Sequence, residues 1–113
     1  MALYYELPVY RDTYRWVLRI HEITREFPRD FKYTLGQDMR RDALTLVRCL
    51  YRANKSRERV EPLEAFLDHF ELLKMELRLC GDMKLMSIKN QAELGLMMDG
   101  IGKQVTGWRN ASR

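Results

Sequence analysis

Two histidines, two cysteines and 16 carboxylates are the residues of this chain whose chemistry could support catalysis or metal binding. A di-iron helix bundle requires Glu-x-x-His pairs on facing helices, but Leu18 and Phe66 stand three positions before the two histidines. The zinc-protease pattern HExxH begins at His21, but Arg25 occupies the place of its second histidine. The glycine motifs that bind phosphates and dinucleotides are absent from the sequence. We therefore expect a non-enzyme with no catalytic residue, no metal site and no cofactor.

The two cysteines, Cys49 and Cys80, lie 31 positions apart, and the sequence contains no CxxC pair. This spacing indicates neither a zinc site nor a redox pair. Both cysteines fall within amphipathic patterns, so we expect two small buried thiols.

Cations at helical spacing indicate binding rather than catalysis. At 100° per residue, four of them project within about 60° of one another. This basic row consists of Arg41, Arg48, Arg52 and Lys55. Because Asp38 and Asp42 fall toward the edge of the row, we expect no carboxylate of the same helix to neutralise it. Arginine suits bidentate contacts with phosphate, and the row therefore predicts an anionic partner.

We expect the positively charged surface to extend beyond both ends of the basic row. The flanking cations are Arg57 and Arg59 after it, and Arg29, Lys32 and Arg40 before it. Phe31, Tyr33 and Tyr51 lie close to these cations in sequence and could stack on unpaired bases. The alternative for Phe31 and Tyr33 is that they only cover the end of the fold.

Net charge is unevenly distributed along the chain. Residues 1–59 hold 13 basic and 8 acidic residues, whereas residues 60–113 hold 7 and 8. The first half thus carries +5 and the second −1, out of a total of +4. Such asymmetry is typical of a protein with an anionic partner, although a mildly basic surface that only favours solubility gives the same totals.

Hydrophobic periodicity predicts one all-α domain, residues 1–113. Apolar residues recur at helical spacing in four segments, about 8–27, 34–55, 62–81 and 87–108. Thr34 and Ser87 are expected N-caps, and Gly81 an expected C-terminal glycine. Four helices of this length with short connections imply an antiparallel up-down-up-down four-helix bundle. The glycines of the last segment either allow close backbone approach or break the helix near Gly100.

Two of the predicted helices have a second apolar face, which a lone bundle would not use. We therefore expect these two ridges to form contacts between subunits of a homo-oligomer. The ridge residues are Tyr10, Tyr14 and Leu18 on the first helix and Leu72, Met75 and Leu79 on the third.

Neither a membrane span nor a secretion signal is expected. No apolar run approaches the ~20 residues that a transmembrane helix needs. The first ten residues, MALYYELPVY, lack the order of a basic region followed by an apolar one. The expected location is the cytoplasm.

A family resemblance is carried by the stretch FPRDFKYTLGQDMRRDALTLVRCLYRAN (27–54), by KQVTGWRN (103–110) and by LPVYRDTYRWVLRIHEITREFPR (7–29). In these blocks the chain resembles the accessory variability determinant proteins of diversity-generating retroelements. The resemblance implies a non-catalytic, basic, barrel-like homopentamer of four-helix bundles. It also implies association with the element's reverse transcriptase and binding of template RNA and DNA with little sequence preference. The implied role is support of mutagenic retrohoming, in which mutagenised cDNA diversifies a target gene.

The nearest alternative is a related superfamily member. The intervening-sequence proteins of 23S ribosomal RNA genes share the bundle, and the same basic row would serve a stand-alone RNA-binding protein of that type. The sequence does not give the number of subunits, the polymerase contact surface or any base preference.

Overall fold

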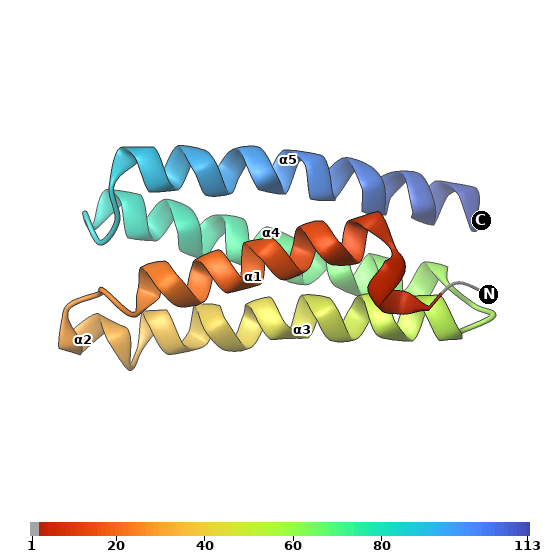
Figure 1. Ribbon diagram of the computed structural model, residues 1–113, viewed down its shortest axis with the longest axis horizontal. Coiled ribbons are helices and arrows are strands. Elements are labelled where there is room, and N and C mark those ends of the chain that lie inside the picture. The colour runs from red at the N-terminus through yellow and green to blue at the C-terminus, as the bar shows by residue number, and fades with distance from the viewer. Residues whose placement is uncertain (1–2) are drawn as a thin grey trace.

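Helices make up nearly all of the described chain, residues 3–113 of a computed structural model. Figure 1 shows four long helices side by side in alternating directions. The elements in chain order are the 3-10 turn η1 (Tyr4–Glu6) and the helices α1 (Pro8–Thr24), α2 (Arg29–Lys32), α3 (Leu35–Lys55), α4 (Val60–Asp82) and α5 (Ile88–Ala111). No strand occurs within residues 3–113. The expected all-α class and four-helix bundle are confirmed.

The four long helices form a square array in which α1 and α4 stand at opposite corners. α1 packs against α3 and α5, and α4 packs against the same two helices. Consecutive long helices are therefore neighbours in space, as short connections require. Across residues 3–113, every helix falls short of the length and apolar character that a bilayer crossing would need.

The core is a column of apolar side chains supplied by all four long helices. Its largest fully buried members are Trp16 and Ile20 of α1, Met39, Leu46 and Leu50 of α3, Leu63, Phe66, Phe70 and Leu73 of α4, and Leu94, Ile101 and Val105 of α5. The indole N–H of Trp16 donates to the carbonyl of Leu94 at 3.2 Å. The largest core side chain thus buries its rings without leaving a donor unsatisfied. Cys49 and Cys80 are free and buried, as expected.

The connection between α1 and α3 is more structured than the sequence indicated. α1 ends at Thr24 rather than at Phe27, and the short helix α2 follows Pro28. Thr34 stands at the N-cap position of α3, but its hydroxyl donates back to the carbonyl of Asp30 at 2.6 Å. The prediction of a Thr34 side-chain cap is therefore wrong, because α2 offers that hydroxyl an acceptor four residues earlier.

The connection between α4 and α5 contains one confirmed cap and one wrong prediction. The hydroxyl of Ser87 accepts the backbone N–H of Asn90 at 3.0 Å, as an N-cap does. α4 continues through Gly81 and ends at Asp82, and the left-handed residue of the turn is Lys84, with φ of 59°. The space that a Cβ would take at Gly81 is occupied by the amide end of the Gln91 side chain, which could move to admit it.

α5 is continuous through its glycines, so the predicted break near Gly100 does not occur. The backbone of Gly95, Gly100 and Gly107 has ordinary φ values, and a Cβ built there would meet nothing within 4 Å. Packing within the bundle therefore gives no reason for glycine at these three positions. Only Gly102 faces a neighbour, because its Cβ would lie 3.4 Å from the Phe70 ring.

Two buried carboxyl groups meet where α3 packs on α4. Asp42 and Glu76 are 7% and 6% exposed. One oxygen of each, Oδ2 of Asp42 and Oε1 of Glu76, has no donor partner in the described structure. Burial first, and then the hydrogen bond to Asp42, raise the pKa of Glu76 to about 8. A single proton shared by the two groups satisfies both oxygens at neutral pH.

Gly100→Ala is expected to raise the free energy of unfolding by about 1 kcal/mol, because alanine costs less helix entropy and its methyl group meets open space. Chemical denaturation measures the difference. Gly36→Ala is the opposite control, since its Cβ would lie 3.1 Å from the backbone oxygen of Phe31 and should destabilise the protein. A destabilised Gly100→Ala variant would contradict this account.

Glu76→Gln is expected to flatten the pH dependence of stability. The folded-state pKa of Glu76 is raised from 4.5 to about 8, so its contribution to stability is complete below 4.5 and is lost as pH rises to about 8. Neutral glutamine can donate to Asp42 at every pH. The loss of stability between pH 4.5 and pH 8, on the order of a few kcal/mol, should therefore be absent from the variant. Denaturation from pH 5 to pH 9 tests this, with exposed Glu71→Gln as the matched control on α4. An unchanged slope in Glu76→Gln would refute the shared proton.

Candidate nucleic-acid interface

The basic row lies on the side of α3 that faces away from the core. All four of its cations are exposed. The opposite side of the same helix carries five fully buried side chains, Met39, Ala43, Leu46, Leu50 and Ala53. Because these residues and the basic row recur on opposite sides of the helix, packing of the apolar side leaves the row exposed to solvent.

At Arg41 the prediction that the row lacks carboxylate partners is wrong. The Arg41 guanidinium lies 3.3 Å from Asp38 and 3.4 Å from Asp42. The extended arginine side chain reaches both, since one lies three positions away and the other is its neighbour in sequence. Arg41 is still two-thirds exposed, so this arginine retains access to solvent in spite of both partners.

The other three members of the row differ in how far they are neutralised. Arg52 lies 3.8 Å from Glu61 of α4, a loose pair between exposed groups. Arg48 and Lys55 form no ion pair with any carboxylate of the described chain. The ammonium of Lys55 instead lies 4.7 Å from the centre of the Tyr51 ring. The unneutralised members of the row are therefore Arg48 and Lys55.

The cations before the row are divided between solvent and structure. Arg29 is exposed, whereas Lys32 and Arg40 are half-buried. The Arg40 guanidinium donates to Thr24 at 3.0 Å and to the carbonyl of Lys32 at 3.1 Å. Arg40 thus joins α1, α2 and α3, and its main contacts are structural. Arg29 is thus exposed, whereas Arg40 holds the joint between the three helices.

The cations after the row show the same division. Arg57 is exposed in the loop between α3 and α4 and forms no ion pair within residues 3–113. Arg59 is half-buried, donates to the carbonyl of Ser56 at 3.2 Å, and lies 6.0 Å from the centre of the Trp108 ring. Arg59 therefore joins the α3–α4 loop to the end of α5, and Arg57 extends the free part of the row.

The three aromatic residues near the row have different environments. Phe31 is half-buried and packs against the core, as the bundle-end alternative predicts. Tyr33 is 60% exposed, and the ammonium of Lys32 lies 5.9 Å from the centre of its ring. Tyr51 is 42% exposed and belongs to a larger group of rings.

That larger group, the tyrosine cluster, was not foreseen from the sequence. Its members are Tyr4 and Tyr5 of η1, Tyr10 and Tyr14 of α1, and Tyr51 of α3. Tyr4 is at its centre, with ring centres 5.1 to 5.4 Å from those of Tyr5, Tyr10 and Tyr51. The adjacent tyrosines Tyr4 and Tyr5, just before Pro8, could have indicated an aromatic cluster from the sequence. The contact between Tyr4 and Tyr51, however, depends on how η1 folds over α3.

The predicted apolar ridges are largely exposed. Tyr14 and Leu18 of α1 are 53% and 50% exposed, and Tyr10 is half-buried against the core. The α4 ridge consists of Leu72, Met75 and Leu79, which are 40%, 54% and 39% exposed. Both long helices therefore present apolar surface that the bundle does not cover.

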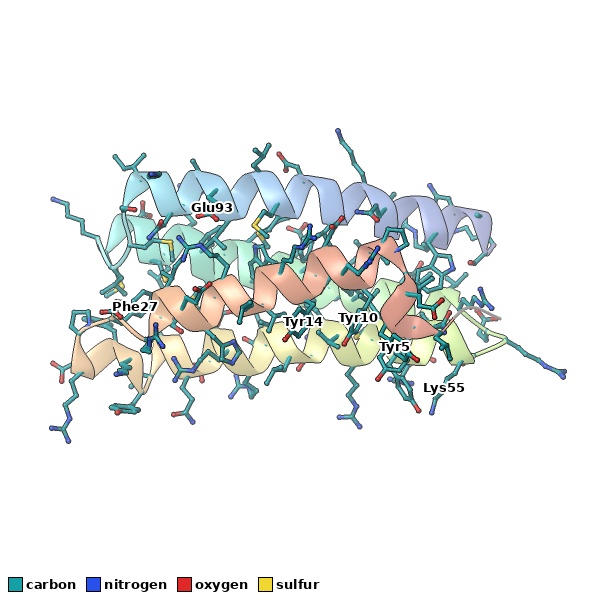
Figure 2. All side chains as sticks on the ribbon, in the orientation of Figure 1. Tyr5, Tyr10, Tyr14, Phe27, Lys55 and Glu93 are labelled. Atoms are coloured by element: carbon teal, nitrogen blue, oxygen red, sulfur yellow. The ribbon has the colours of Figure 1, made fainter. Side chains whose placement is uncertain are left out.

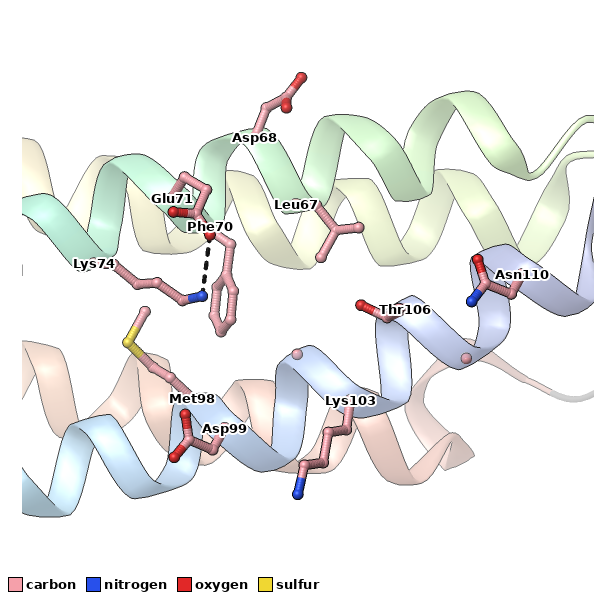
Figure 3. Close-up of a pocket in the computed structure, with 12 residues that line it drawn as sticks. Leu67, Asp68, Phe70, Glu71, Lys74, Met98, Asp99, Lys103, Thr106 and Asn110 are labelled. Carbon is pink, nitrogen blue, oxygen red and sulfur yellow. Dashed lines mark hydrogen bonds and ion pairs between the residues drawn. The ribbon is translucent and has the colours of Figure 1, made fainter.

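A groove of about 760 Å³ lies between α4 and α5 (Figure 3). Phe70 and Met98 supply apolar lining, and Gly102 and Gly107 widen it. The charged lining residues are Asp68, Glu71, Asp99, Lys74 and Lys103. The ammonium of Lys74 lies 3.1 Å from Glu71, so the positive charge in the groove is partly neutralised. Mixed charges of this kind do not select an anion.

No cluster of three or more histidine, cysteine, aspartate or glutamate side chains within residues 3–113 could hold a metal ion. His21 is half-buried, and its Nδ1 donates to the carbonyl of Val17 at 2.9 Å. Burial raises the pKa of the Cys80 thiol to about 12, so its thiolate is disfavoured.

Comparison with known proteins gives one family. The family model described as bAvd-like matches residues 9–112, nearly the whole chain. No curated protein matches the chain. The bundle and the three sequence blocks agree with this result: the chain belongs to the bAvd-like family of accessory variability determinant proteins.

Proposed function

We propose that this chain is a non-catalytic accessory protein of a diversity-generating retroelement. In this role it binds the element's reverse transcriptase together with template RNA and cDNA, and thereby supports mutagenic retrohoming in the cytoplasm. Family membership supports the retroelement setting. The observation that carries nucleic-acid binding is the exposed side of α3, where Arg48 and Lys55 have no carboxylate partner within residues 3–113.

The chemistry of this surface suits a polyphosphate chain. Arg57 continues the unneutralised cations beyond the end of α3, and Arg29 stands exposed before its start. Exposed cations on a rigid helix contact phosphates and do not read bases, so binding is largely independent of sequence. It is also sensitive to salt, because phosphate contacts release counterions.

Self-association is part of the proposal. The ridges on α1 and α4 leave apolar side chains about half exposed, which favours contact between copies of the chain. Family resemblance favours a pentamer. Each added subunit would contribute a net charge of +4 and another basic row, so assembly would strengthen the attraction for nucleic acid.

The second candidate is a stand-alone RNA-binding bundle of the 23S ribosomal RNA intervening-sequence type. The same α3 cations favour it, since they need no polymerase to contact RNA. A gene setting within a ribosomal RNA operon would support this candidate. A neighbouring reverse transcriptase gene with paired template and variable repeats would support the retroelement role.

Co-purification tests the polymerase partnership. The tagged chain, expressed with the reverse transcriptase encoded beside its gene, is expected to retain that enzyme at low salt and after nuclease treatment. Nuclease treatment removes association that depends only on shared nucleic acid. Absence of the enzyme from the low-salt eluate would refute this partnership.

Charge reversal tests the α3 surface. Arg48→Glu together with Lys55→Glu is expected to weaken binding to a labelled RNA at least tenfold near physiological salt and to lower the salt slope by about two. Fluorescence anisotropy measures both quantities. Arg78→Glu with Lys89→Glu makes the same change in net charge on exposed parts of α4 and α5, and should have a smaller effect. Equal losses in the two variants would show that net charge, and not the α3 surface, governs binding.

A further inference from the structure

The tyrosine cluster brings five of the six tyrosines of the chain to one side of the bundle. They come from three elements, η1, α1 and α3. Figure 2 shows Tyr5, Tyr10 and Tyr14 on the side where α1 lies over α3, with Lys55 at the end nearest Tyr5. The cluster is therefore produced by tertiary structure, and η1 contributes two of its rings.

The two rings that contact Tyr4 on the side of α3 and the chain's N-terminal turn, Tyr51 and Tyr5, are open to solvent. Tyr5 is 52% exposed and Tyr51 is 42% exposed, although both adjoin Tyr4. Tyr4 meets both rings edge to face, at interplanar angles of 80° and 85°. An edge-to-face contact with Tyr4 covers at most one face of each ring, and the exposed part of Tyr5 and Tyr51 can still meet another π-system.

Cations adjoin this open end of the cluster. Lys55 lies 4.7 Å from the centre of the Tyr51 ring, and Arg48 is one helical turn before Tyr51 on the same side of α3. Neither cation is neutralised by a carboxylate of the described chain. The surface thus combines aromatic faces with unneutralised positive charge.

This combination suits unpaired nucleotides better than it suits duplex or protein. Bases of a single strand stack on aromatic side chains while nearby cations hold the phosphates, whereas duplex bases are already stacked on each other. A second copy of this basic chain would bring like charge to the Tyr5 and Tyr51 end of the cluster, beside Lys55. The proposed subunit contacts therefore involve the α4 ridge of Leu72, Met75 and Leu79 and the other end of the α1 ridge, at Tyr14 and Leu18.

We infer that Tyr5 and Tyr51 form a stacking platform for the bases of single-stranded nucleic acid, with Lys55 and Arg48 holding the adjacent phosphates. This inference rests on the proposed function and adds to it the class of ligand: unpaired strand rather than duplex. It also gives η1 a role, because η1 places Tyr5 beside Tyr51 through Tyr4.

The test compares two probes that carry the same number of phosphates, a labelled oligothymidylate and a labelled DNA duplex. Tyr5→Leu with Tyr51→Leu is expected to weaken binding of the oligothymidylate about fivefold or more, because each lost ring removes a stacked base. Binding of the duplex should change less than about twofold, since the cations remain. Tyr5→Phe with Tyr51→Phe keeps both rings and should bind like the wild type.

Tyr33→Leu is the matched control, because Tyr33 is also exposed and also has a lysine near its ring, but lies outside the cluster. Its loss should weaken oligothymidylate binding less than the double leucine change does, because Tyr33 lies outside the cluster. Equal losses for the two probes in the leucine variant, or no loss for either, would overturn the platform while leaving nucleic-acid binding intact. Wild-type protein that binds neither probe would overturn the proposed nucleic-acid binding itself. A changed oligomeric state of the leucine variant in sedimentation would assign the rings to a subunit contact and refute the inference.

A second measurement uses only wild-type protein and so does not depend on the folding of a variant. Ultraviolet crosslinking to an oligonucleotide containing 5-bromodeoxyuridine, followed by mass spectrometry, should place the crosslinks on the peptides with Tyr5 and Tyr51. Crosslinks confined to peptides of α4 and α5 would overturn the platform.

Discussion

Burial of one side of α3 is the constraint on which the rest of the structure depends. This helix packs against both α1 and α4, and five of its apolar side chains are completely shielded from solvent. Rotation of α3 about its axis would expose those side chains, which costs about 25 cal/mol for each Å² of apolar surface. The orientation of α3 is therefore fixed, and the basic row on the opposite side is held toward solvent without any dedicated support. The exposed basic row and the buried side of α3 are two consequences of the same helical period.

The carboxyl pair on the α4 side of α3 is a polar exception within this packing. Asp42 belongs to the edge of the basic row and also to the buried seam with Glu76. It accepts from Arg41 through one oxygen and faces α4 with the other. A surface cation and a buried, protonated acid are thus linked through one aspartate.

Helix ranges and faces were accessible from the sequence because they depend on local periodicity. Each long helix begins and ends within three residues of its predicted range, and the basic row of α3 was identified from spacing alone. The errors occurred where a side chain had a choice of partner. Thr34 donates backward to Asp30 instead of capping α3, and Arg41 reaches carboxylates that a helical projection places at the edge of the row. Sequence spacing predicts the direction in which a Cβ points from a helix. A long or polar side chain can still pair with any of several acceptors within its reach, and spacing does not predict which one.

The sequence by itself determined the helical class, the exposed cations of α3 and the absence of a recognisable catalytic motif, because each depends on residue type and on spacing within one segment. Only the tertiary structure decided which cations are free and which hold the fold together, as the contrast between Arg48 and Arg40 shows. It also decided that Tyr4 meets Tyr51 and that Asp42 meets Glu76. These pairs join segments far apart in the chain, and such contacts are set by how helices pack rather than by any local pattern.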